Sequence, residues 1–180
     1  MNIYDSLKKG ITQAIEYEKE NSENIRVQEM TVTNVSKPAT FGLSAFDVAS
    51  WFISYNNSQE NTDCLTDLKL QKLLYYAQGI AIKYTGKTLF NESICAMQYG
   101  PVVKEVYDKY KSYGRKPIDE NVKAPVFEND VTVILEDVFD EYGQFSAWKL
   151  VEMTHNESPW AETTRNCIIT VDKLKKFFTR

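Results

Sequence analysis

The sequence is poor in the residues that build metal sites, disulfides and phosphate loops, with one histidine, three cysteines and seven glycines. The cysteines, Cys64, Cys95 and Cys167, lie far apart and are odd in number, so neither a CxxC pair nor a disulfide framework is expected. With His155 as the one histidine, we expect no metal site. GxGxxG and GxxxxGKS/T motifs are also absent, so we expect no cofactor and none of the common nucleotide-dependent enzymes.

Long apolar runs are missing as well. No stretch approaches the roughly 18 consecutive apolar residues of a membrane helix, and the first ten residues lack the apolar run of a signal peptide. These absences favour a cytoplasmic protein without a membrane partner. The 25 acidic and 21 basic side chains give a net charge of -4, which argues against a protein that coats nucleic acid.

What is present is typical of a soluble globular protein, since 43% of the residues are hydrophobic and 26% are charged. The length of 180 residues favours one domain with an appendage. We place the boundary at a linker over 36–42, which contains Pro38 and Gly42. The two parts are therefore 1–41 and 42–180.

The N-terminal part is predicted to be an appendage of one helix and one strand. Residues 2–20 have an amphipathic helical pattern, and 26–35 are rich in β-branched residues. Two such elements are too small to bury their own apolar faces. We expect them to dock on the main domain, on a second copy in a homodimer, or on a partner, with the edge of the strand available for pairing.

The main part is predicted to be mainly α, a compact helical domain of about six helices. Ser or Thr residues precede several apolar helical patterns and are the expected N-caps, namely Ser44, Thr66, Ser146 and Thr170, and Asn129 is the expected cap of a further helix. Pro101 suits the first turn of a helix that ends at Gly114. In these helices Tyr107 and Trp148 belong to the apolar faces.

The most apolar helix is expected over 68–84. It has two apolar stripes, with Gln71 and Gln78 between them and Tyr75 on the narrower stripe. The positions left for a solvent-facing ridge are Lys69, Lys72, Tyr76, Gly79 and Lys83. Buried glutamines need hydrogen-bond partners, so Gln71 and Gln78 either bond to neighbouring loops of the chain or face a groove for a partner's backbone.

Three segments carry a resemblance to a known family. They are LTDLKLQKLLYYAQ at 65–78, YGPVV at 99–103 and THNESPW at 154–160. In this order and spacing they resemble the Panacea domain of the SocA-like and GepA-like phage-associated antitoxins, and the resemblance runs over about 44–178, most of the chain. One departure is the stretch 95–98, where the family often has a tryptophan and this chain has CAMQ.

The resemblance implies an antitoxin, not an enzyme, that neutralises a cognate toxin protein by direct binding. For the SocA-like branch it also implies an adaptor that delivers the toxin to a protease such as a Clp-type unfoldase. No helix-turn-helix pattern follows the first helix, so nucleic acid is not the expected partner. The alternative function is a nucleic-acid-binding regulator or an enzyme of phage origin.

Two observations keep that alternative open. His155 could act as a general base with Glu152 or Glu157 as its orienting partner, although the favoured reading is a structural role beside Trp160. A basic cluster on and after the third helix could contact nucleic acid or line a solvated edge, and it consists of Lys104, Lys109, Lys111, Arg115 and Lys116.

The partner-binding residues that we expect are Gln71, Tyr75, Gln78, Tyr99 and Trp160. The first three would line the groove along the apolar helix, because side-chain amides can both donate to and accept from a bound backbone. Tyr99 and Trp160 would lie at its edge, since amphipathic rings are common interface anchors.

Overall fold

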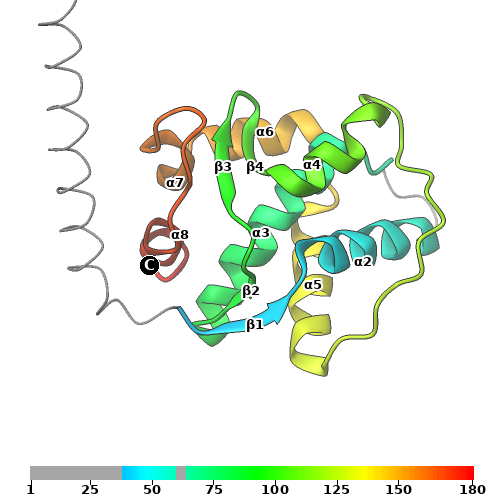
Figure 1. Ribbon diagram of the computed structural model, residues 1–180, viewed down its shortest axis with the longest axis horizontal. Helices are drawn as coiled ribbons and strands as arrows, with labels where there is room; N and C mark the ends of the chain where they lie inside the picture. The colour runs from blue at the N-terminus through cyan, green and yellow to red at the C-terminus, as the bar shows by residue number, and fades with distance from the viewer. Residues whose placement is uncertain (1–37, 60–63) are drawn as a thin grey trace, which may run out of the picture. The chain divides into compact units, whose positions relative to one another are not determined.

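The computed structural model describes residues 38–59 and 64–180. The helix predicted over 2–20 and the strand over 26–35 lie outside these residues. In the described part the fold is mainly α, as predicted (Figure 1), and its elements are β1 (Thr40–Leu43), α2 (Ala45–Ser58), α3 (Asp67–Thr85), β2 (Thr88–Phe90), β3 (Ile94–Met97), β4 (Gly100–Val103), α4 (Lys104–Tyr110), α5 (Asn129–Tyr142), α6 (Ala147–His155), α7 (Ser158–Ala161) and α8 (Val171–Phe178).

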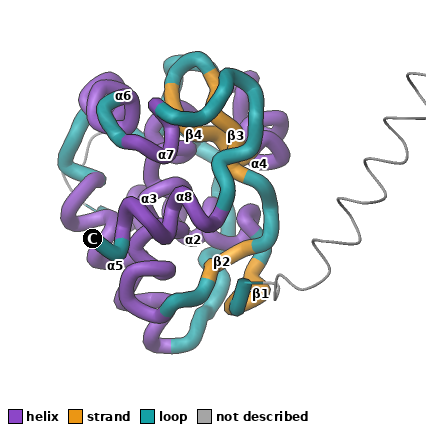
Figure 2. Tube along the Cα trace, turned by 90° about the vertical axis from the view of Figure 1, so that its left-hand side faces the viewer, coloured by secondary structure: helices purple, strands orange, loops and turns teal. Residues whose placement is uncertain are grey.

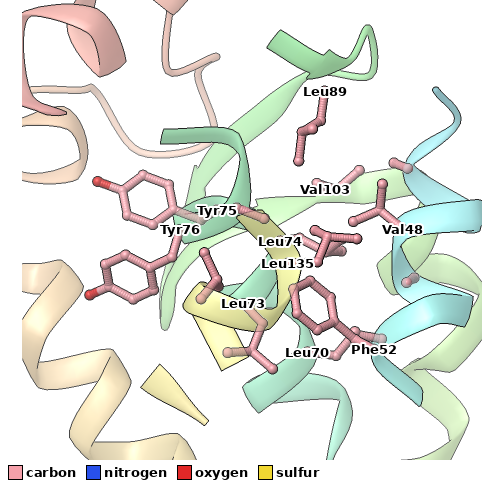
Figure 3. Close-up of a cluster of buried hydrophobic side chains, with 14 of the residues drawn as sticks. Val48, Phe52, Leu70, Leu73, Leu74, Tyr75, Tyr76, Leu89, Val103 and Leu135 are labelled. Carbon is pink, nitrogen blue, oxygen red and sulfur yellow. The ribbon is translucent and has the colours of Figure 1, made fainter. Parts of the chain in front are cut away.

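Helix α3 is the centre of the fold, with α2, α5, α6 and α8 and the strands β2 and β4 packed around it (Figure 1). Thr66 caps its first turn by accepting a hydrogen bond from the backbone N–H of Lys69, and Gly86 ends it in the left-handed conformation. Leucines of α3 pack against Phe52 of α2 and Leu135 of α5 in the hydrophobic core shown in Figure 3. This explains why the segment is so apolar.

The solvent-facing ridge predicted on α3 is wrong at four of its five positions. Lys69, Lys72 and Tyr76 are 0–1% exposed, and Gly79 is buried. The reason is that α6, α8 and β4 cover this face. Gly79 leaves room for the ring of Phe178, because a Cβ there would lie 2.2 Å from that ring. Lys83 alone of the five is exposed.

Helix boundaries follow the predicted caps closely. Ser44, Thr66, Ser146 and Thr170 each accept a backbone N–H of the first helical turn, as expected. Asn129 is instead the first residue of α5, behind Glu128. The additional helix α7 is a single turn that we did not predict, with Pro159 in its first turn.

Short strands, which the sequence did not predict, form two small two-stranded sheets, and β2 and β4 pack against α3 at different points along it. β1 pairs in parallel with β2, and β3 pairs antiparallel with β4 (Figure 2). An isolated antiparallel β-bridge also pairs the backbone of Cys95 in β3 with that of Ile168. β1 lies partly in the predicted linker 36–42. The helix predicted to begin at Pro101 begins at Lys104, because 100–103 pair with β3 and are held on α3 by side chains of that helix.

Candidate functional site

Gln71 joins the first turns of α3 to β4. Its oxygen Oε1 accepts a hydrogen bond from the backbone N–H of Val103 at 2.9 Å, and its Nε2 donates to Oδ1 of Asp67 at 3.1 Å. The side chain is 1% exposed. Losing such bonds would leave buried polar atoms unpaired, at about 1–3 kcal/mol each, so Gln71 holds β4 in place.

Lys72 holds the same strand at a second point. Its ammonium group donates to the carbonyl of Pro101 at 3.0 Å. Burial lowers the pKa of Lys72 to about 7, although the charge of Asp67 opposes that shift. The backbone of Gly100 passes so close that a Cβ would lie 2.7 Å from Cε of Lys72, and its φ of 101° also favours glycine. The Lys72 side chain therefore holds the Tyr99–Gly100 turn in place.

Gln78 repeats this arrangement at β2. Its Oε1 accepts from the backbone N–H groups of Leu89 at 2.8 Å and Phe90 at 3.3 Å, and its Nε2 donates to the Phe90 carbonyl at 3.0 Å. The amides of Gln71 and Gln78 thus bind backbone, as the groove hypothesis required, but the backbone is the chain's own. Their burial favours the alternative reading, in which they bond to neighbouring loops. Their contact with a partner stays a prediction.

Tyr75 lies inside the protein and not along an open groove, with 0% of its surface exposed. Its hydroxyl donates to Glu157 at 2.7 Å, and the Tyr76 hydroxyl donates to the other oxygen of the same carboxylate at 2.9 Å. Figure 3 shows both rings on one side of the hydrophobic core, with their hydroxyl groups pointing the same way. Burial raises the pKa of Glu157, and the two hydroxyls lower it in part.

Trp160 stacks on His155, with ring centroids 3.9 Å apart and planes 13° apart. Its indole N–H donates to the Met97 carbonyl at 2.9 Å, so it ties α7 to the end of β3. This agrees with the structural role considered for His155. Glu157, a possible orienting partner of His155 as a general base, bonds the two tyrosines instead. Burial lowers the pKa of His155.

A pocket of about 200 Å³ opens beside the Tyr99 turn. It is formed by the first turns of α3, the loop between β3 and β4, and one face of α4, and its lining residues are Asp67, Leu68, Gln71, Met97, Gln98, Tyr99, Val102 and Tyr107. Gln71 and Tyr99, two of the predicted binding residues, therefore meet at one pocket. Tyr75, Gln78 and Trp160 do not line it.

Three exposed aromatic side chains surround this pocket or adjoin it. Tyr99 is 49%, Tyr107 36% and Trp148 57% exposed. The rings of Tyr99 and Trp148 meet edge to face, with centroids 5.6 Å apart and planes at 87°. We call the pocket together with these three side chains the aromatic surface. Large exposed rings gathered at a pocket are typical of a protein-binding site.

Tyr107 and Trp148 were missed as site residues, because we assigned both to buried helix faces. Val106 and Tyr110 form the buried face of α4. In α6 the buried residues are Leu150, Val151 and Thr154, and Trp148 falls about 160° away from Leu150 around the helix.

Three further features concern metal binding, membrane crossing and the basic cluster. Within the described part of the chain no group of three or more His, Cys, Asp or Glu side chains is arranged to hold a metal ion. No described helix has the length and apolarity that crossing a bilayer requires. In the basic cluster, Lys109 pairs with Glu120 and Lys111 with Asp108, so part of its positive charge is neutralised.

Comparison of the sequence with known protein families places the chain in a family of antitoxin-like proteins. The chain is a member of the family described as Antitoxin SocA-like, Panacea domain, which matches residues 70–161. It is similar to Antitoxin SocA of Caulobacter vibrioides (strain NA1000 / CB15N), with 30% identity over an alignment of 109 residues that covers 53% of this chain. The chain covers 58% of that relative's length. No solved structure matches the chain.

Proposed function

We propose that this protein is an antitoxin that neutralises a cognate toxin protein by direct binding, and that the aromatic surface contacts the toxin. Membership of the SocA-like family supports the antitoxin role. The proposed location of the binding site rests on the edge-to-face pair of Tyr99 and Trp148, whose side chains are 49% and 57% exposed. Trp and Tyr are enriched among the residues that dominate binding energies at interfaces.

The turn that presents Tyr99 is well fixed, which favours tight binding. Lys72 holds the Pro101 carbonyl, Gln71 holds the Val103 N–H, and the Trp160 indole holds the Met97 carbonyl on the other side of the turn. A binding loop that is already ordered loses less conformational freedom when a partner docks. In this proposal Gln71 and Trp160 support Tyr99, while Gln78 and Tyr75 support the fold behind it.

The action that we propose is occlusion of the toxin without turnover, in the cytoplasm. A second mode, in which the protein also delivers its toxin to a protease such as a Clp-type unfoldase, rests on the family resemblance. We also propose a homodimer and an N-terminal part, 1–41, that contributes to partner choice. Both proposals rest on the sequence pattern of that part, whose predicted helix and strand are too small to bury their own apolar faces.

The test is co-expression of this chain with the product of the adjacent reading frame. We expect that product alone to arrest growth and co-expression to restore it. The double variant Tyr99→Ala/Trp148→Ala should lose protection at the same expression level. Tyr84→Ala, which removes a ring that is 59% exposed at the other end of α3, should still protect.

Growth arrest that persists with the unaltered chain would contradict the antitoxin role. Full protection by the double variant would instead contradict the aromatic surface as the binding site.

A further inference from the structure

The pocket of the aromatic surface combines apolar walls with one buried carboxylate. Leu68, Met97 and Val102 supply apolar lining, and Asp67 lines the pocket at the start of α3. Asp67 is 6% exposed. Its oxygen Oδ1 accepts one hydrogen bond from Gln71, whereas an ionised carboxylate can accept about four. The carboxylate therefore retains capacity for a donor that enters the pocket.

The charge of Asp67 is only partly compensated. None of the residues that the structure describes forms an ion pair with it. Lys72 attracts it, but the Lys72 ammonium donates to Pro101, and burial of Asp67 raises its pKa overall. A positive group placed in the pocket would supply the missing charge and hydrogen bonds, because a buried carboxylate is stabilised by a paired donor.

The other residues that line the pocket also suit a positively charged side chain. The long aliphatic stem of Arg or Lys packs well along apolar surface, which Leu68 and Val102 provide. Its charged end is attracted to the faces of aromatic rings, and Tyr99 and Tyr107 lie at the pocket. An acidic or phosphorylated group would be repelled by Asp67, and a purely apolar side chain would leave the carboxylate without a partner.

We propose that this pocket receives a single basic side chain of the partner protein, an arginine or a lysine, which pairs with Asp67 while its stem packs on Leu68 and Val102. This rests on the proposed function in so far as the partner is the toxin. The pocket itself is a property of this chain, so it can be tested without a toxin.

The test is an NMR titration of the full chain with N-acetyl-arginine-N-methylamide, following the backbone amides of Gln98 and Tyr99. We expect saturable binding with a Kd on the order of 1 mM, about −4 kcal/mol. The matched probes are the citrulline compound, which is uncharged but has nearly the same shape, and the norleucine compound, which has an apolar chain. Both should bind at least tenfold more weakly.

Two variants should weaken binding, and a third variant serves as the control. Asp67→Asn should weaken binding of the arginine probe more than tenfold, and Tyr107→Ala about threefold, as for loss of a cation–π contact. Asp108→Asn removes an exposed carboxylate from the same helix as Tyr107 and should change nothing. If Asp67→Asn fails to fold, Tyr107→Ala and the citrulline probe still decide.

The proposal is overturned if citrulline or norleucine binds as well as arginine, or if folded Asp67→Asn binds the arginine probe unchanged. This outcome differs from failure of the proposed function. A toxin that binds through Tyr99 and Trp148 while the arginine probe does not bind would retain the function and reject the pocket's occupant. A bound probe without a bound toxin would do the reverse.

Discussion

Gln71 and Gln78 lie two turns apart on α3, and each binds the backbone of a different strand. Gln71 accepts from Val103 of β4, and Gln78 accepts from Leu89 and Phe90 of β2. One helix thus supplies the hydrogen-bond partners that a neighbouring strand would normally give to a strand edge. The polar positions on this apolar helix fix the two strands, and through β4 they fix the turn that presents Tyr99.

The first prediction concerns that arrangement. Gln78→Leu keeps the side-chain volume but leaves two backbone N–H groups and one carbonyl without their partner. Each buried unpaired group costs about 1–3 kcal/mol, so we expect the free energy of unfolding to fall by at least 2 kcal/mol in urea. Gln144→Leu, on the surface beyond α5, should stay within about 0.5 kcal/mol of the unaltered protein. An equally small effect at Gln78 would contradict the supporting role.

The second prediction tests the close contact between Gly79 and Phe178. A Cβ on Gly79 would lie 2.2 Å from the Phe178 ring, so Gly79→Ala should force α8 away from α3. Overpacking of this kind typically costs about 1–3 kcal/mol. In the Phe178→Ala background the space is open, and the same change should cost much less. Additive losses in this double-mutant cycle would show that the two residues are not coupled.

The third prediction concerns Glu157, whose pKa is raised by burial. The folded state then binds its proton more tightly than the unfolded state does. The free energy of unfolding should therefore fall as pH rises from the unfolded pKa, near 4.5, through the raised folded pKa. Glu157→Gln cannot titrate. The free energy of unfolding of the unaltered protein minus that of this variant should therefore decrease with rising pH. A difference that is independent of pH would contradict the assignment.

The fourth prediction has the opposite sign and concerns Lys72. Its pKa is lowered from 10.5 to about 7, so the unfolded state binds more protons between these values. Stability should therefore rise with pH across that interval. In Lys72→Met this contribution is absent, and the buried tyrosines titrate alike in both proteins. The stability difference, measured by urea unfolding at pH 7 and pH 9.5, should move in favour of the unaltered protein at the higher pH. No movement would mean that Lys72 is not buried as described.

The sequence was sufficient to predict the helices of the main part except the single turn α7, because apolar periodicity and capping residues are local signals. Ser44, Thr66, Ser146 and Thr170 cap helices as expected. Local signals do not show which elements cover a helix. For this reason Lys72 and Gly79, polar or small by type, were expected in solvent although β4 and α8 bury them.

The site was predictable only in part. The family resemblance and the amphipathic character of the tyrosine ring pointed to Tyr99, which lines the pocket together with Gln71. The amide chemistry expected of Gln71 and Gln78 is present, but the backbone that they bind comes from strands that no periodicity indicated. Trp148 approaches Tyr99 from another helix, and such a pairing follows from the tertiary fold alone.

The most direct test of the central claim is the Kd of the complex with the cognate toxin, measured by calorimetry for four forms of the full chain. Trp148→Ala and Tyr99→Ala should each raise the Kd about 30-fold or more, corresponding to about 2 kcal/mol for loss of an interface anchor. Tyr84→Ala should bind like the unaltered protein. The melting temperatures of the three variants should lie within a few degrees of that of the unaltered protein. Unchanged affinity in both ring variants, or an equal loss in Tyr84→Ala, would contradict the claim that the antitoxin meets its toxin at the aromatic surface.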